Sequence, residues 1–185
     1  LAAPSANRFG RLRPTTPAHV REELGNTVDL VLDGGACKVG LESTIVGFND
    51  HAAIILRPGG IPLESLVEVL GGKVIVPEKK NHAIRVPGSL PSHYAPATPL
   101  ELLPTESLWL RALELEAEGL RTVIMTWSGQ NPNLPEKKNL IHFAMPAEPK
   151  VYGSRLYATL RRLDHERFDR LLIEAPPADS AWMAI

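Results

Sequence analysis

The spacing of apolar residues divides the chain into two regions with different secondary structure. In the first region, short apolar runs predict strands, and residues 63–70 carry apolar side chains at helical spacing. Thr16 followed by Pro17 is typical of a helix start, and Gly25 is typical of a helix end. Most of the elements predicted in this region are nevertheless strands. The predicted strands are residues 28–32, 43–48, 52–56 and 74–76.

The second region alternates strand with helix. One predicted helix spans 105–118, with Leu108, Ala112 and Leu115 on a single face, and a second spans 154–164. Regular alternation of this kind indicates βαβ units and a parallel sheet. No G-x-G-x-x-G motif follows these strands, so the pattern does not predict a dinucleotide site. The predicted strands are residues 100–103, 122–126, 141–145 and 171–174.

A proline-rich segment separates the two regions. Five of the 23 residues from 77 to 99 are proline. Proline lacks a backbone donor and disfavours helices and central strands, which predicts an extended connector. We therefore expect a first domain over 1–76, a connector over 77–99 and a second domain over 100–185, all of the α/β class.

Composition and charge narrow the class of function. The 185 residues are 44% hydrophobic, and 20 basic residues face 21 acidic ones, a formal net charge of -1. A protein that binds nucleic acid mainly through bulk charge would be strongly basic, so this class is disfavoured. The first 21 residues nevertheless hold four arginines and no carboxylate. Such a small basic surface suits a phosphate-bearing small molecule, although a solvated loop has the same composition.

Further features bear on location and on the chain ends. A single cysteine, Cys37, cannot form an internal disulfide, which fits a reducing cytoplasm. No apolar run approaches the ~20 residues that span a bilayer, and no cluster of histidine, cysteine and acidic residues predicts a metal site. The chain starts at Leu1 rather than at methionine and stops within a predicted helix near Trp182. We expect it to be part of a longer protein.

Two polar clusters could carry chemistry, although each has a simpler reading. Gly59-Gly60 follows Arg57-Pro58 and could cradle a phosphate, but a tight turn between a strand and a helix uses the same residues. Glu42-Ser43-Thr44 opens an apolar strand, where hydroxyl groups more often cap a turn than bind a ligand. Neither cluster alone predicts a site.

In combination, these motifs resemble a known family. Their order along the chain is similar to that in the second half of the YrdC-like domain, the catalytic domain of threonylcarbamoyl-AMP synthases. The connector motifs, Pro87-Gly88 and 92–96, resemble the linker of the long, two-domain form of that family, and residues 100–185 resemble its Rossmann-like C-terminal domain. The motifs in the first region are residues 3–7, Gly10, 14–16, 32–35, 40–46 and 56–61.

The resemblance implies an enzyme with defined substrates. The family condenses L-threonine, bicarbonate or carbon dioxide, and ATP into threonylcarbamoyl-AMP, and it releases pyrophosphate. The product is the donor for the t6A modification beside the tRNA anticodon, so other tRNA threonylcarbamoylation proteins are the expected downstream partners. ATP is a substrate, and Mg²⁺ is expected to accompany it. Arginine and hydrogen-bond donors suit this chemistry because charge develops on the phosphoryl oxygens.

The resemblance also assigns roles residue by residue. Ser5 and Asn7 match the catalytic S-x-N pair near the nucleotide phosphates. Ala3 and Ser43 match contacts to threonine. The expected ATP-binding residues are Ser5, Asn7, Arg13, Arg57 and Tyr94.

Two departures from the family pattern affect these expectations. Arg13 stands where the family usually carries a serine that reaches the phosphates, and it either substitutes by charge or faces solvent. A catalytic K-x-R motif lies upstream in the family and is absent from these 185 residues. Without its positive charges, we expect the parent protein to be the active enzyme and this chain alone to be inactive.

Two alternatives to the synthase stay open at this point. YrdC-like domains carry a positively charged concavity, so the chain could be an RNA-binding module, with steep salt dependence as its signature. It could also be a regulatory relative that keeps the pocket without synthesis. The sequence does not predict an oligomeric state.

Overall fold

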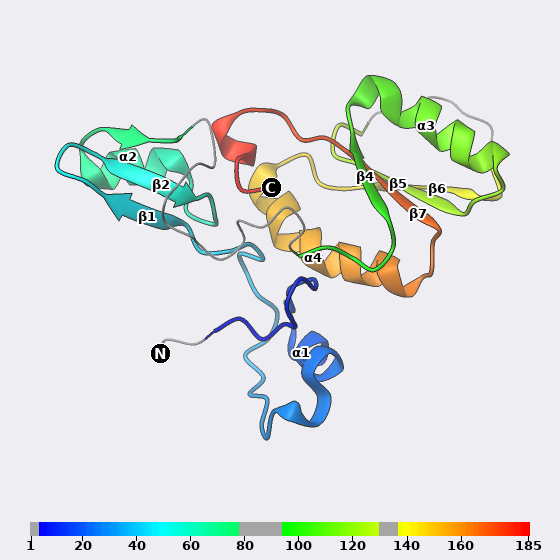
Figure 1. Ribbon diagram of the computed structural model, residues 1–185, viewed down its shortest axis with the longest axis horizontal. Coiled ribbons are helices and arrows are strands. Elements are labelled where there is room, and N and C mark those ends of the chain that lie inside the picture. The colour runs from blue at the N-terminus through cyan, green and yellow to red at the C-terminus, as the bar shows by residue number, and fades with distance from the viewer. Residues whose placement is uncertain (1–3, 78–93, 130–136) are drawn as a thin grey trace. The chain divides into compact units, whose positions relative to one another are not determined.

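The computed structural model describes residues 4–77, 94–129 and 137–185 and divides into two compact units (Figure 1). The first unit comprises Leu1–Ala95 and Ala178–Ile185, and the second comprises Pro96–Pro177. Most of the connector predicted over 77–99 lies outside the described residues, so the domain boundaries at 76 and 100 stay predictions. The two units are described separately below.

The first unit begins with a helix whose ends were predicted from the sequence. Helix α1 (Pro17–Leu24) starts after Thr16, whose hydroxyl accepts a hydrogen bond from the backbone N–H of His19. Gly25 ends the helix with a positive φ of 52°, a conformation in which glycine lacks the steric cost of other residues. A single 3₁₀ turn, η1 (Gly25–Thr27), follows directly.

A small sheet and one helix form the rest of this unit. Strands β1 (Ile45–Phe48) and β2 (Ala53–Arg57) make an antiparallel hairpin, and β3 (Val74–Ile75) adds to β2 in parallel. The side chain of Asn49 shapes the hairpin turn by accepting hydrogen bonds from two following backbone N–H groups. Helix α2 (Leu63–Leu70) connects β2 to β3 and ends at Gly71, as the sequence predicts.

The strand predicted at 28–32 is wrong. These residues form no regular element, and the side chains of Leu30 and Leu32 are 75% and 82% exposed. A strand requires a neighbour for its backbone hydrogen bonds. Among the described residues, no strand pairs with this segment, so the apolar pattern alone does not produce a strand.

The second unit is built on a parallel four-stranded sheet. Its strands are β4 (Leu100–Leu103), β5 (Thr122–Thr126), β6 (Leu140–Ala144) and β7 (Arg170–Glu174), in the spatial order β4-β7-β5-β6. All three pairings are parallel. The predicted α/β class and parallel sheet are therefore confirmed.

Two helices cover the opposite faces of this sheet (Figure 1). Helix α3 (Thr105–Ala117) connects β4 to β5, and α4 (Pro149–His165) connects β6 to β7. The two connections run in opposite directions along the sheet, and right-handed crossovers then place their helices on opposite faces. Leu108, Ala112 and Leu115 are the buried residues of α3, as predicted, and they pack with Ile124 and Leu172 of the sheet.

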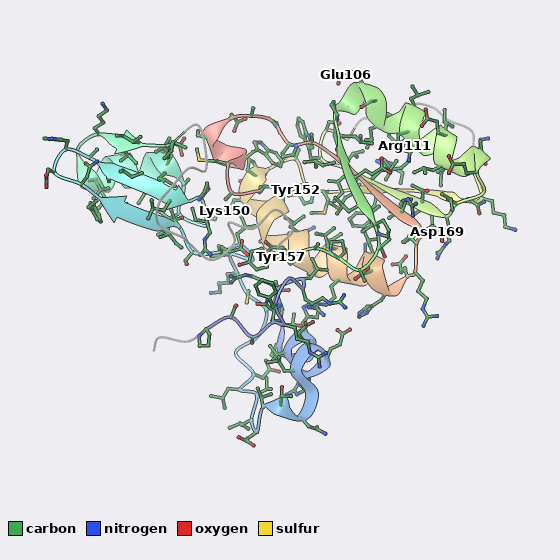
Figure 2. The ribbon with its side chains drawn as sticks, in the orientation of Figure 1. Glu106, Arg111, Lys150, Tyr152, Tyr157 and Asp169 are labelled. Carbon is green, nitrogen blue, oxygen red and sulfur yellow. The ribbon has the colours of Figure 1, made fainter. Side chains whose placement is uncertain are left out.

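Helix α4 begins five residues before its predicted start at Ser154. The side chain of Glu148 caps the helix by accepting hydrogen bonds from the backbone N–H groups of Lys150 and Val151, at 3.0 and 2.8 Å. Pro149 occupies the first helical position, which suits its fixed φ. This early start places Tyr152, labelled in Figure 2, on α4, where its side chain is buried.

A buried carboxylate at the end of β7 connects this strand to the residues that follow β4 and β5, at the carboxyl edge of the sheet. Glu174, at the end of β7, is 1% exposed. It accepts hydrogen bonds from the Thr105 hydroxyl at 2.8 Å and from the backbone N–H groups of Trp127 and Ser128 at 2.9 and 3.0 Å. Burial alone would raise the pKa of Glu174, but these hydrogen bonds outweigh it and hold the pKa below its ordinary value.

Two further features complete the fold. The described chain ends in a single 3₁₀ turn, η2 (Ser180–Trp182), rather than in the helix that the sequence predicts there. The hydroxyl of Ser180 hydrogen-bonds to the side chain of Glu64 on α2, within the first unit. Among the described residues, no helix has both the length and the apolar character needed to cross a membrane.

The Glu174 network leads to a prediction about stability. We expect Glu174→Gln to lower the free energy of unfolding by about 2–3 kcal/mol, because an amide cannot accept all three hydrogen bonds and leaves buried donors unpaired. Urea unfolding at neutral pH measures the loss. The folded pKa lies below the ordinary 4.5, so this stabilisation is present above pH 4.5 and disappears as the pH falls through the folded pKa. The difference between the two proteins should shrink accordingly in acid.

A matched control removes an exposed carboxylate from the same unit. Glu118 follows α3, and its side chain is exposed. Glu118→Gln should change the free energy of unfolding by less than about 0.5 kcal/mol. Equal losses for the two variants would show that the Glu174 hydrogen bonds do not stabilise the unit.

Candidate functional site

Arg13 lies between a buried acid and an aromatic ring in the first unit. Its Nε is 2.7 Å from Oε1 of Glu42, whose side chain is only 8% exposed. Its Nη2 donates a hydrogen bond to the Tyr94 hydroxyl at 2.7 Å, and the guanidinium carbon lies 4.6 Å from the centre of the Tyr94 ring. These three side chains come from distant parts of the sequence. They join the segment after the predicted S-x-N pair to the end of the predicted connector.

Ser43 and Arg57 form a second group beside the first. The Arg57 guanidinium donates to the Ser43 carbonyl from Nε at 3.2 Å and from Nη2 at 2.8 Å. Nη2 also donates to the Ser43 hydroxyl at 3.0 Å. Ser43 itself is exposed, so its hydroxyl is oriented by Arg57 while it still faces solvent. Because Ser43 follows Glu42 directly, the two groups adjoin.

The turn after Arg57 is packed against the backbone of 42–44. Gly59 is buried, and a Cβ at this position would overlap the Glu42 carbonyl oxygen and the Thr44 nitrogen. The backbone N–H of Gly60 donates to the Glu42 carbonyl at 2.8 Å. The Thr44 hydroxyl both donates to the Ile61 carbonyl and accepts from its N–H. Close packing therefore explains the first glycine of the Gly59-Gly60 pair.

Asn7 presents a buried hydrogen-bond acceptor. Its Nδ2 donates to the backbone carbonyls of Arg8 and Arg11, at 2.9 and 3.4 Å. These two acceptors determine which side of the amide is nitrogen. Its Oδ1 is buried and accepts no hydrogen bond from any described residue. Buried acceptors without a donor are rare in native proteins, and a ligand donor would satisfy this one.

The segment that contains Asn7 also contacts the residues around Tyr94. The backbone N–H of Ala95 donates to the Gly10 carbonyl at 3.1 Å, and Arg11 and Ala95 form a parallel β-bridge. Five residues predicted from the resemblance are thus connected through short contacts in one unit. They are Asn7, Arg13, Ser43, Arg57 and Tyr94.

Two further predicted site residues, Ser5 and Ala3, are not part of this described set. Ser5 is exposed. Ala3 lies outside the described residues, so its predicted contact to threonine stays a prediction. Glu42 was not among the predicted site residues, although it is the acid that binds Arg13. The signal for it was the run of four arginines without a carboxylate in the first 21 residues, since a half-buried arginine needs an acidic partner from elsewhere.

The described residues contain no group of three or more histidine, cysteine, aspartate or glutamate side chains that could hold a metal ion. The chemistry that the site offers is that of hydrogen bonds and arginine charges. Planar guanidinium groups match carboxylates and phosphates, so the arrangement suits a ligand that carries such groups.

Comparison with known proteins identifies the family. Residues 61–185 match the family model described as "Threonylcarbamoyl-AMP synthase, C-terminal domain". The chain belongs to the threonylcarbamoyl-AMP synthase family. Residues 1–59 match a second model, described as "Telomere recombination". The family that the sequence motifs resemble is therefore confirmed.

Individual relatives agree with this assignment. The chain is 32% identical over 203 residues to the threonylcarbamoyl-AMP synthase of Schizosaccharomyces pombe, covering 100% of this chain and 50% of the relative. It is 29% identical over 189 residues to that of Bacillus subtilis, covering 100% and 54%. The chain therefore spans about half the length of these curated relatives.

A solved structure shows the same fold. The crystal structure of P. abyssi Sua5 complexed with L-threonine matches this chain with a TM-score of 0.79 and 25% sequence identity. The match covers 99% of this chain and 54% of that chain. The threonine complex is a property of that relative.

The packing of Gly59 leads to a prediction about the site. We expect Gly59→Ala to displace the backbone of 42–44 and to lower the free energy of unfolding of the first unit by about 1–3 kcal/mol. Gly34→Ala is the matched control, since a Cβ there meets no atom within 4 Å and its φ is not positive. Thermal unfolding of both variants measures the effect. Equal stability of the two variants would contradict the close approach.

Proposed function

We propose that the protein containing this chain is a threonylcarbamoyl-AMP synthase. It condenses L-threonine, bicarbonate or carbon dioxide, and ATP to threonylcarbamoyl-adenylate and pyrophosphate. The product serves tRNA t6A modification by downstream threonylcarbamoylation proteins in the cytoplasm. Membership of the family and the fold shared with a threonine-bound relative support this function. The observation that carries it is the Arg57–Ser43 group beside the Arg13–Glu42 pair.

The proposed roles follow from the chemistry of each group. The threonine amine and bicarbonate give a carbamate with loss of water, and a carbamate oxygen then attacks the α-phosphorus of ATP while pyrophosphate leaves. Arg57 stabilises negative charge on the phosphates, since its guanidinium stays charged and its planar fork matches phosphate oxygens. Ser43 binds threonine through the hydroxyl that Arg57 orients, and Ala3 contributes a backbone contact to it. One guanidinium therefore connects the two proposed substrate positions.

The remaining predicted residues complete the nucleotide site. Ser5 and Asn7 are proposed as catalytic residues near the phosphates, and Asn7 offers the buried Oδ1 that accepts no hydrogen bond from the described residues. Arg13 and Tyr94 are proposed to belong to the ATP site. Mg²⁺ is proposed to enter together with ATP.

Pyrophosphate release tests the proposed function. The assay uses the protein encoded by the complete reading frame, with ATP, Mg²⁺, L-threonine and bicarbonate. We expect pyrophosphate to form only when all three substrates are present, and threonylcarbamoyl-adenylate to form in equal amount. Threonine binding without pyrophosphate would indicate a regulatory relative instead. Steeply salt-dependent binding of RNA without synthesis would indicate an RNA-binding module.

The contact between Arg57 and Ser43 predicts that substitutions at these two residues affect ATP binding and threonine binding differently. Arg57→Ala should weaken ATP binding by about 1.5–3 kcal/mol through the loss of a charge-assisted contact. It should also weaken threonine binding, because the Ser43 hydroxyl loses the group that orients it. Ser43→Ala should weaken threonine binding and leave ATP binding nearly unchanged. Calorimetric titration of each ligand into each variant measures all four effects.

Arg21→Ala is the control for this pair. Arg21 is an exposed residue of α1, so its loss removes one positive charge outside the site and should leave both affinities unchanged. Full threonine affinity in Arg57→Ala would show that Arg57 does not orient Ser43.

A further inference from the structure

The contacts of Arg13 show that much of its charge is already used within the protein. Its guanidinium pairs with Glu42 at 2.7 Å, and this carboxylate is buried, with 8% of its side chain exposed. A buried carboxylate needs a compensating charge, so Arg13 stays close to Glu42. An arginine held in this way is poorly placed to donate its full charge to phosphates.

The other side of the guanidinium faces Tyr94. Nη2 donates to the Tyr94 hydroxyl at 2.7 Å, and the guanidinium carbon is 4.6 Å from the ring centre. Contacts between arginine and an aromatic ring are attractive, and they strengthen when the pair is shielded from water. Arg13 and Tyr94 are each only partly exposed. Arg13 therefore contacts both the hydroxyl and the ring of Tyr94.

The backbone of Tyr94 also needs such support. Its φ is 60°, and Arg167 is the only other residue except glycine with a positive φ in the described part of the chain. A bulky residue in this region of φ is strained and persists when its surroundings hold it there. The hydrogen bond from Ala95 to Gly10 and the β-bridge between Ala95 and Arg11 hold the adjacent backbone. Arg13 holds the side chain.

We propose that Arg13 is a positioning residue, which links buried Glu42 to Tyr94 and so places the Tyr94 ring in the ATP site before the nucleotide binds. This proposal rests on the proposed function and replaces a direct phosphate contact by Arg13 with an indirect role. A guanidinium is required, because it carries several donors in a rigid plane that can pair with a carboxylate and contact a ring together. Lysine keeps the charge but lacks that plane, and serine is too short to reach both partners.

The contact between Arg13 and Tyr94 can be tested without any ligand. The full-length protein is labelled with 3-fluorotyrosine, which gives a ¹⁹F resonance for each tyrosine, and Tyr94→Phe assigns the resonance of Tyr94. We expect Arg13→Ser and Arg13→Lys to move this resonance by more than its linewidth. Arg21→Ser, which removes one exposed arginine, should leave it in place. An unmoved Tyr94 resonance in Arg13→Ser would overturn the proposal.

The indirect role is tested by combining variants in ATP titrations. We expect Arg13→Ser and Tyr94→Ala each to weaken ATP binding about tenfold, and the double variant to be no weaker than either one, because both changes remove the same positioned ring. Arg13→Lys should lose as much as Arg13→Ser. Retained affinity in Arg13→Lys, or additive losses in the double variant, would show that Arg13 acts on the phosphates by its charge, and would overturn the indirect role.

The two measurements separate this proposal from the proposed function. Failure of the unmodified full-length protein to bind ATP would overturn the proposed function, and with it any role of Arg13 toward ATP. The ¹⁹F spectrum would then decide by itself whether Arg13 positions Tyr94.

Discussion

The buried carboxylate of Glu42 is the constraint on which the candidate site depends. A carboxylate that is 8% exposed must be paired, and its partner Arg13 comes from a segment 29 residues earlier in the numbering. The pair therefore holds two distant segments together. Through Arg13 the constraint extends to Tyr94, and through the peptide bond it extends to Ser43, which Arg57 orients. Loss of this ion pair would break the connection between Glu42 and Tyr94 that runs through Arg13.

The close approach of backbone segments works together with this ion pair. Gly59 lies where a side chain would overlap the backbone of 42–44, and the Thr44 hydroxyl exchanges two hydrogen bonds with Ile61. The turn after β2 and the segment before β1 consequently position each other. Because these two segments hold each other in place, Glu42 stays buried. Ser43, the next residue, is exposed at a fixed position.

The second unit also contains a buried carboxylate whose burial must be compensated. Glu174 is buried at the carboxyl edge of the parallel sheet, where it accepts hydrogen bonds from the loops that follow β4 and β5. Here the compensation comes from hydrogen-bond donors rather than from an arginine. These hydrogen bonds compensate for the burial of Glu174, as expected for a carboxylate with a structural role. In the first unit, by contrast, Asn7 keeps a buried acceptor that no described residue satisfies.

The sequence by itself determined most helices and strands, because their signals are local. Thr16 and Gly25 cap α1, and the apolar face of α3 appears as predicted. The motifs around Ser43 and Arg57 also sufficed to indicate the family. Local signals failed at residues 28–32, where the apolar residues have no strand to pair with in the part of the chain that the structure describes.

Tertiary structure alone decided the strand order β4-β7-β5-β6 and the partners of the site residues. Strand order depends on which crossovers pack over which face of the sheet, and no short segment encodes that choice. The sequence alone likewise allows two interpretations of Arg13, as a solvated residue or as a phosphate ligand. Its pairing with Glu42 and Tyr94 follows from the burial of a carboxylate that is distant in the chain, and burial is a property of the whole fold.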